Sequence, residues 1–105
     1  MGVTRAGTLL AQNMKRCRVI LHINQAQLAE RVGCSTTTIA RLESLERFAS
    51  ARQLDRIAKA LRVPLKELFT EDSQAIRALA KDYEVRDRLK DEVSKAIDGT
   101  FDANK

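Results

Sequence analysis

The chain has 105 residues, 44% of them hydrophobic and 4% aromatic, and a formal net charge of +5. This length allows one compact core with a short extension and excludes a second, enzyme-sized domain. Aromatic residues and proline are scarce, and long helix-favouring side chains are plentiful, so the composition predicts an all-α fold.

The charge is unevenly distributed along the chain. Residues 1–70 contain 12 Lys/Arg and 5 Asp/Glu, a balance of +7, whereas residues 71–105 contain 7 and 9, a balance of −2. A compact basic domain suits a polyanion such as DNA, because neutralising phosphates releases condensed counterions. Charge alone is equally compatible with an ordinary solvated surface.

The two cysteines, Cys17 and Cys34, form no C-x-x-C motif, which favours a reducing compartment. No apolar run exceeds three residues, which argues against a transmembrane helix and a signal peptide, so we expect a cytoplasmic protein. His22 could join the cysteines in a metal site, but the three lack ligand spacing. We therefore expect core thiols, no metal and no cofactor.

Residues 1–8 contain two glycines and show no periodicity, so we expect a short N-terminal arm. An apolar stripe then predicts a helix over residues 8–21. Asn24 is a suitable N-cap for a short second helix that ends at Gly33, and Ser35 can cap a third helix that continues to about residue 45. In that third helix, Ile39 and Leu42 lie three residues apart and are expected to face the core.

A loop over residues 46–49 precedes a fourth helix, which Ser50 can cap and which Pro64 terminates. Residues 65–69 predict a last small helix, so five helices close one core by residue 70. Removing everything after Phe69 is therefore expected to leave a folded monomer.

Residues 71–98 predict a helical segment for oligomerisation or partner binding, followed by a polar tail at 99–105 that begins with Gly99. Its two apolar patches point about a quarter turn apart, so either the helix bends near residues 84–88 or each half packs on something different. The expected dimer or partner contacts are apolar residues from both patches: Ile76, Leu79, Tyr83, Leu89, Val93 and Ile97.

Residues 24–45 form a predicted helix-turn-helix, whose second helix can enter the major groove of DNA. If Ile39 and Leu42 face the core, the residues on the opposite face are Thr36, Thr37, Ala40, Arg41 and Ser44. Threonine hydroxyls can bond base edges, small side chains can touch a thymine methyl group, and arginine can bind guanine O6 and N7. The N-termini of three predicted helices, at Asn24, Ser35 and Ser50, offer backbone N–H groups to phosphates.

Residues 9–69 resemble the Cro-like, phage-repressor (XRE) family of helix-turn-helix domains. The matching positions carry the residues typical of each helix: Arg18, Asn24-Gln25-x-x-Leu28-Ala29, Gly33-x-Ser35, Ile39-x-x-Leu42-Glu43 and Leu54-x-x-Ile57-Ala58-x-x-Leu61-x-Val63. The resemblance implies a five-helix, λ-repressor-like domain at residues 9–70.

The resemblance also implies roles for individual residues. Thr36, Thr37 and Arg41 would read bases, with Ala40 on the same face, and Arg18 and Glu43 would form a structural ion pair. The residues that would bind the phosphate backbone are Gln25, Ser35, Thr38, Arg47 and, as a helix start, Ser50. The family usually has Gly at the positions of His22 and Leu45 and Pro at that of Ala49, so the loop carrying Arg47 is expected to differ in shape.

These features indicate a homodimeric, sequence-specific transcriptional regulator that represses from an inverted-repeat operator. An enzyme is not expected, because the sequence has no nucleophile elbow, phosphate-binding glycine loop or paired catalytic carboxylates. The alternative is a protein-interaction module, such as the DNA-binding subunit of a toxin–antitoxin or anti-repressor pair. In that case the partner would bind residues 71–98.

Overall fold

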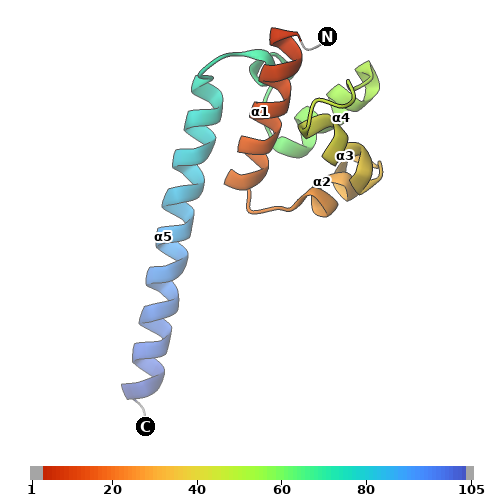
Figure 1. Cartoon of the computed structure of the whole chain (residues 1–105). Coiled ribbons are helices and arrows are strands. Elements are labelled where there is room, and N and C mark those ends of the chain that lie inside the picture. Colours follow the sequence, from red (N-terminus) through yellow and green to blue (C-terminus); the bar gives the residue numbers. More distant parts are fainter. Residues whose placement is uncertain (1–3, 104–105) are drawn as a thin grey trace.

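A computed structural model describes residues 4–103, with side chains described to residue 96. These residues form helices and loops only, which confirms the all-α prediction. A globular domain of four α-helices and one 3-10 helix precedes a long final helix that projects from it (Figure 1). The elements are α1 (Arg5–Ile20), α2 (Gln25–Val32), α3 (Thr36–Glu43), α4 (Ala51–Leu61), η1 (Leu65–Phe69) and α5 (Gln74–Ala103).

Side-chain caps begin the three short helices, as predicted. Asn24, Ser35 and Ser50 each accept a hydrogen bond from the backbone N–H three residues later. At α2 and α4 the side chains of Gln27 and Gln53 in turn accept from the backbone N–H of Asn24 and Ser50, which completes a capping box. Each cap satisfies backbone donors that the first turn of a helix would otherwise leave unpaired.

The first helix begins at Arg5, three residues before the predicted start, because Thr4 caps it by accepting from Gly7 N. Residues 5–8, expected to belong to an arm, therefore form its first turn. Gly7 is buried there, and a Cβ at this position would lie 3.3 Å from the ring of Phe48. The glycine thus allows the loop after α3 to approach α1, and does not indicate an unstructured arm.

Several turns use the left-handed backbone region. Gly33 ends α2 with φ 84°, and His22 and Leu45 have φ 58° and 67°, at the two positions where the family usually has glycine. A non-glycine residue in this region costs about 1–3 kcal/mol, so the surrounding packing must hold it there. Because Leu45 adopts this conformation, α3 ends at Glu43 and does not continue to residue 45.

Every helix contributes to one core. The fully buried large side chains include Met14 and Cys17 of α1, Leu28 of α2 and Ile57 of α4. Burial raises the pKa of the Cys17 thiol to about 11, so this thiol stays protonated and unreactive at neutral pH.

A buried polar residue fastens the end of the domain to α1. Asn13 is 6% exposed, and its side-chain amide donates to the carbonyl oxygens of Leu68 (2.9 Å) and Thr70 (3.1 Å). Ser73 is fully buried and accepts from Ile76 N, so it caps α5. The η1–α5 connection is therefore part of the domain and not a linker.

The helix α5 is uninterrupted from Gln74 to Ala103. The prediction that the helix ends before Gly99 is therefore wrong. The helix runs beside α1 in the same direction and then continues past the domain (Figure 1). Its first half packs on the domain and its second half is exposed, so the packing of the second half on a different surface stays a prediction. No helix in the described part of the chain has the length and apolar character needed to cross a membrane.

The first half of α5 belongs to the core of its own domain. Ile76 is fully buried, and Leu79 and Tyr83 pack partly buried against the same core. The prediction that these residues contact a partner is therefore wrong for Ile76, and Leu79 and Tyr83 use much of their surface within the chain. Leu89 and Val93 are 55% and 56% exposed, and the side chain of Ile97 lies outside the described residues.

Burial of Ile76 also overturns the expectation that a fragment ending at Phe69 keeps a complete core. We predict that Ile76→Ala lowers the free energy of unfolding by about 2–5 kcal/mol, because it leaves a cavity between α5 and the domain. Urea denaturation measures the loss. The control Val85→Ala, on the exposed part of α5, should change it by no more than about 0.5 kcal/mol. Equal effects of the two substitutions would show that α5 is not part of the folding unit.

Candidate nucleic-acid interface

The orientation of α3 follows from the two side chains that it buries. Ile39 is fully buried and Leu42 is 3% exposed. The opposite face is open, with Thr36, Thr37 and Arg41 exposed and Ala40 half-buried. The structure therefore brings the four residues predicted to read bases onto one accessible helix face, together with exposed Ser44.

This face combines small size with hydrogen-bonding capacity. The threonine hydroxyls donate and accept, and the guanidinium of Arg41 offers paired donors that match guanine O6 and N7. The side chains beside Arg41 are short, so the helix backbone can approach base edges closely. The geometry is that of a helix able to enter a groove about 12 Å wide.

The residues predicted to bind phosphates surround this helix, and several of them also have structural roles. Ser35 is exposed, but its Oγ accepts from Thr38 N (3.1 Å) and lies 2.9 Å from Thr38 Oγ1. Ser50 caps α4 in the same way. A phosphate at either helix start would therefore be bound chiefly by backbone N–H groups of the first turn.

Arg47 is exposed in the loop after α3, and the loop is held in place by α3 itself. The backbone N–H groups of Glu46 and Arg47 donate to the carbonyl oxygen of Arg41, at 2.9 and 3.3 Å. The loop thus turns tightly over the end of the helix, with Leu45 in the left-handed conformation. This bend holds the backbone of Arg47 against the end of α3, although the Gly and Pro of the family pattern are absent.

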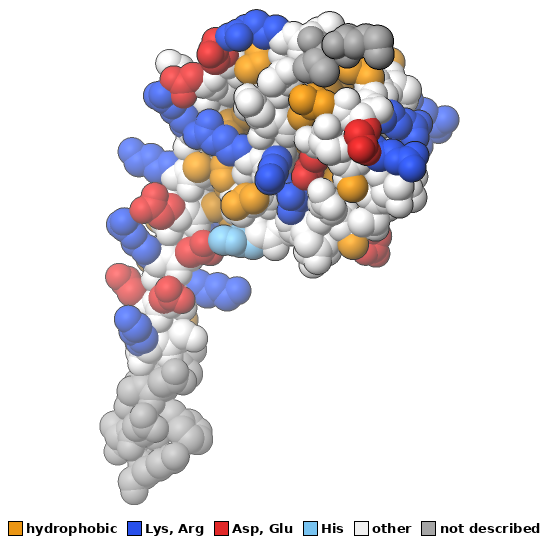
Figure 2. All heavy atoms as spheres, viewed as in Figure 1, with side chains coloured by type: hydrophobic (Ala, Val, Ile, Leu, Met, Phe, Trp, Pro, Cys, Tyr) orange, Lys and Arg blue, Asp and Glu red, His pale blue; other side chains and the backbone are white. Residues whose placement is uncertain are grey.

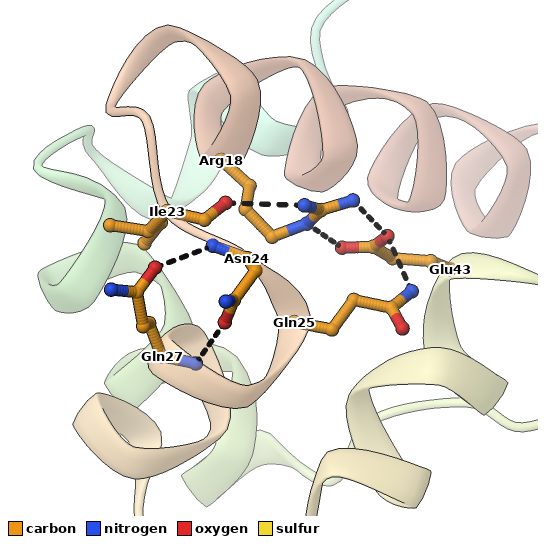
Figure 3. A network of polar contacts seen from close by, with 6 residues as sticks. All are labelled: Arg18, Ile23, Asn24, Gln25, Gln27 and Glu43. Carbon is orange, nitrogen blue, oxygen red and sulfur yellow. Dashed lines mark hydrogen bonds and ion pairs between the residues drawn. The ribbon is translucent and has the colours of Figure 1, made fainter.

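A network of three side chains connects α1, α3 and the start of α2 (Figure 3). Arg18 donates to both carboxylate oxygens of Glu43, from Nε at 2.9 Å and from Nη2 at 3.0 Å, and its Nη1 donates to Ile23 O. The side chains of Arg18 and Glu43 are 13% and 5% exposed. A bidentate pair so far removed from water fixes the direction of both partners.

Gln25 extends this network towards the solvent. Its Nε2 donates to Glu43 Oε1 at 3.1 Å, and its side chain is half-buried (Figure 3). An amide NH2 group has two donors, so one can bind Glu43 while the other binds a phosphate. Sequence reasoning assigned Gln25 to phosphate and Glu43 to the ion pair and missed the bond between them, because Gln25 and Glu43 lie 18 residues apart on different helices.

Three exposed arginines lie in α3, in the loop after it and at the start of α4. Arg41, Arg47 and Arg52 are exposed, and within the described residues none of them forms an ion pair with a carboxylate. The three arginines of α5, by contrast, each pair with an acidic neighbour, as Arg77 does with Asp72, Arg86 with Asp82 and Arg88 with Glu84. Charges without an acidic partner remain available to phosphates.

The described residues contain no cluster of three His, Cys, Asp or Glu side chains that could hold a metal ion. Cys17 and Cys34 are free thiols, and burial raises the pKa of both. His22 lies elsewhere on the surface, where its Nε2 is 2.8 Å from Asp87 Oδ2 of α5. The three side chains considered as a metal site therefore have separate surroundings.

The Arg18–Glu43 pair should be sensitive to loss of one partner. We predict that Glu43→Leu lowers the free energy of unfolding by about 3 kcal/mol, because it leaves the Arg18 guanidinium buried without its carboxylate. The double variant Arg18→Met/Glu43→Leu should regain most of this loss. Arg16→Met removes an exposed charge from the same helix and is the control. Urea unfolding curves measure these variants, the single variant Arg18→Met and the wild type. Additive losses in the double variant would contradict a coupled, desolvated pair.

A comparison with protein-family models matches residues 14–68 to HTH_3, a helix-turn-helix family. The match covers more than half of the chain and spans the elements from the middle of α1 to η1. Comparisons with curated proteins and with solved structures gave no significant match. The α2–turn–α3 geometry, the exposed face of α3 and this match agree, and the chain belongs to the Cro-like, phage-repressor (XRE) family of helix-turn-helix DNA-binding regulators.

Proposed function

We propose that the protein is a transcriptional repressor that binds an inverted-repeat operator as a homodimer, with α3 of each copy in the major groove. The observation that carries this proposal is the exposed face of α3, which has Thr36, Thr37 and Arg41 outward while Ile39 and Leu42 are buried. Two-fold symmetric dimers bind two half-sites about one helical turn, ~34 Å, apart. Occupation of such a site across a promoter blocks transcription.

In this proposal, contacts to bases and contacts to phosphates have different effects. Base contacts from α3 select the sequence, whereas phosphate contacts set the position of the protein and add affinity at every site. Gln25, the helix starts capped by Ser35 and Ser50, and Arg47 make the phosphate contacts. The bond from Gln25 to Glu43 holds the amide in place before DNA arrives, so less side-chain entropy is lost on binding.

The direct test is selection of binding sites from random and genomic DNA by the purified full-length chain. We expect a two-fold symmetric motif with half-sites separated by one helical turn. Enrichment of no sequence would overturn the proposal. Recovery of one unpaired half-site would support recognition by α3 and contradict the dimer.

We predict that Arg41→Ala relaxes the preference at one base pair of each half-site by about 1–3 kcal/mol, because a bidentate contact to guanine is lost. Competition binding against operators with single substitutions measures this preference. Arg77→Ala removes the same charge from the start of α5, where Arg77 pairs with Asp72, and is the matched control. An unchanged preference profile in Arg41→Ala would remove Arg41 from the base-reading set.

Gln25 and Arg47 should give a different pattern, since both are assigned to phosphates. We predict that either alanine variant weakens binding about tenfold at operator and non-operator DNA alike. Only Arg47→Ala should also reduce the salt dependence, by about one unit in the slope of log K against log salt, because only Arg47 carries a charge. Titrations at several salt concentrations separate the two. Loss at the operator alone would show that the residue reads bases.

A further inference from the structure

A basic groove lies between α2 and α4, at the ends of these helices. It encloses about 440 Å³, and the described residues that line it are Arg31, Arg56, Lys59, Ala60 and Arg62. Four of these side chains are cationic, and none is acidic. Along α5, by contrast, acidic and basic side chains lie next to one another (Figure 2). Cations that line one groove repel each other, and a bound anion removes that repulsion.

Two of the four cations have no acidic partner. Within the described part of the chain, neither Arg31 nor Arg56 forms an ion pair with a carboxylate, and both side chains are exposed. Lys59 pairs with Asp55, but both members of this pair are exposed to water, so the pair is weak. The two arginine guanidinium groups are therefore available, and their planar forks match phosphate oxygens.

Two arginine side chains are held at the groove by the fold. Arg62 follows α4 with φ 61°, and its Nη1 donates to the hydroxyl oxygen of Tyr83 in α5 at 3.0 Å. Arg56 lies against the turn between α2 and α3, because a Cβ at Gly33 would be 3.3 Å from its Nη1. Side chains that are already in place lose less entropy when a ligand binds.

The helix dipoles explain only part of this cluster. Arg31 and Lys59 lie in the last turns of α2 and α4, where a cation interacts favourably with the dipole of its helix. Arg56 lies in the middle of α4, so the dipole of its own helix gives no reason for a cation there. Its side chain nevertheless lines the same groove.

We propose that the basic groove binds a small anion with two or three linked phosphates, of the kind found in nucleotides. Arg31 contacts the phosphate chain from α2, and Arg56, Lys59 and Arg62 contact it from α4 and its C-terminal cap. Residues three apart on a helix have Cβ atoms about 5–6 Å from each other, so Arg56 and Lys59 can meet successive phosphates. A single phosphate would meet only some of the four cations.

The lining of the groove favours a small phosphate ligand over a protein. Among the described residues that line it, only Ala60 is apolar. Protein interfaces depend on large aromatic and apolar side chains that are buried at their centre. The lining also has no aromatic ring on which a base could stack, so the phosphate chain alone is recognised.

The basic groove uses different residues from the surface proposed to bind DNA. That surface includes the starts of α2 and α4, at Gln25 and Ser50, whereas Arg31 and Arg62 lie at the opposite ends of these two helices. The helix α4 has 11 residues and is therefore about 16 Å long. The inference needs no DNA and goes beyond the proposed function.

Calorimetric titration of the full-length chain with tripolyphosphate, at constant ionic strength and without divalent cations, tests the site. We expect saturable binding of one ligand per chain. Arg56→Gln should weaken it at least about tenfold, because a charge-assisted contact is lost. Arg52→Gln removes the same charge from the start of the same helix, and as the matched control it should change binding less than about twofold. Both side chains are exposed, so both variants should unfold at the urea concentration of the wild type.

Two further probes define the ligand. ATP should bind within about threefold of tripolyphosphate, because its base finds no partner in the groove, and sulfate should bind at least about tenfold more weakly, because it meets fewer cations. NMR shifts of backbone amides during the tripolyphosphate titration should change at residues 31–33 and 56–62. A much tighter binding of ATP would overturn recognition of the phosphate chain alone.

Two results would overturn the site itself. Equal losses in Arg52→Gln and Arg56→Gln, with shift changes in α3, would assign the anion to the surface proposed for DNA. The absence of saturable binding up to about 10 mM tripolyphosphate would show that the groove holds no such ligand. If Arg56→Gln then lowered the salt dependence of DNA binding by about one unit, the groove would be a contact to the DNA backbone instead.

Discussion

Burial of Ile39 and Leu42 in the core is the constraint on which the candidate DNA-binding surface depends. The helix that carries them has only eight residues, so two apolar contacts three positions apart decide which of its faces meets solvent. Thr36, Thr37 and Arg41 are exposed for that reason. Hydrophobic contact has no direction of its own, however, and two apolar side chains alone would allow α3 to tilt or slide.

The Arg18–Glu43 pair supplies the missing direction. Glu43 is the last residue of α3, and the two bonds from the Arg18 guanidinium hold that end of the helix at a defined distance from α1. Removing both charges from water is costly, so such a pair contributes more to a unique geometry than to net stability. The bond from Gln25 joins the start of α2 to the same carboxylate, which links a predicted phosphate contact to the position of the reading helix.

The two halves of the long helix α5 have different roles. Its first half completes the core through Ile76, and Asn13 and Ser73 fix the chain immediately before it and at its start. Contacts such as His22–Asp87 continue this attachment to the end of α1. Beyond them the described side chains of α5 are exposed, and the pair Arg88–Glu84 links two turns of the helix itself. The second half of α5 therefore projects from the domain (Figure 1) and carries the exposed side chains of Val85, Leu89 and Val93.

The features that the sequence predicted correctly depend on residues close together in the chain. Asn24, Ser35 and Ser50 cap helices through bonds to N–H groups three positions away, and the inward side of α3 follows from a spacing of three. The resemblance to the family added what spacing does not show, namely the Arg18–Glu43 pair and the special turns at His22 and Leu45. These short-range and family-specific patterns were sufficient for the helix-turn-helix and for its candidate reading face.

The features that the sequence did not reveal depend on residues far apart in the chain. The sequence predicts Gly7 in a short arm, whereas in the structure Phe48 packs against it, and Asn13 binds carbonyl groups 55 and 57 residues away. The apolar pattern of α5 identified two patches, but only the packing of the folded domain showed that one faces its own core and the other faces solvent. The sequence by itself determined the local elements and the candidate face for reading DNA, because caps and helical periodicity act within a few residues. The tertiary structure decided what each apolar face packs against, because burial depends on which distant segments the folded chain brings together.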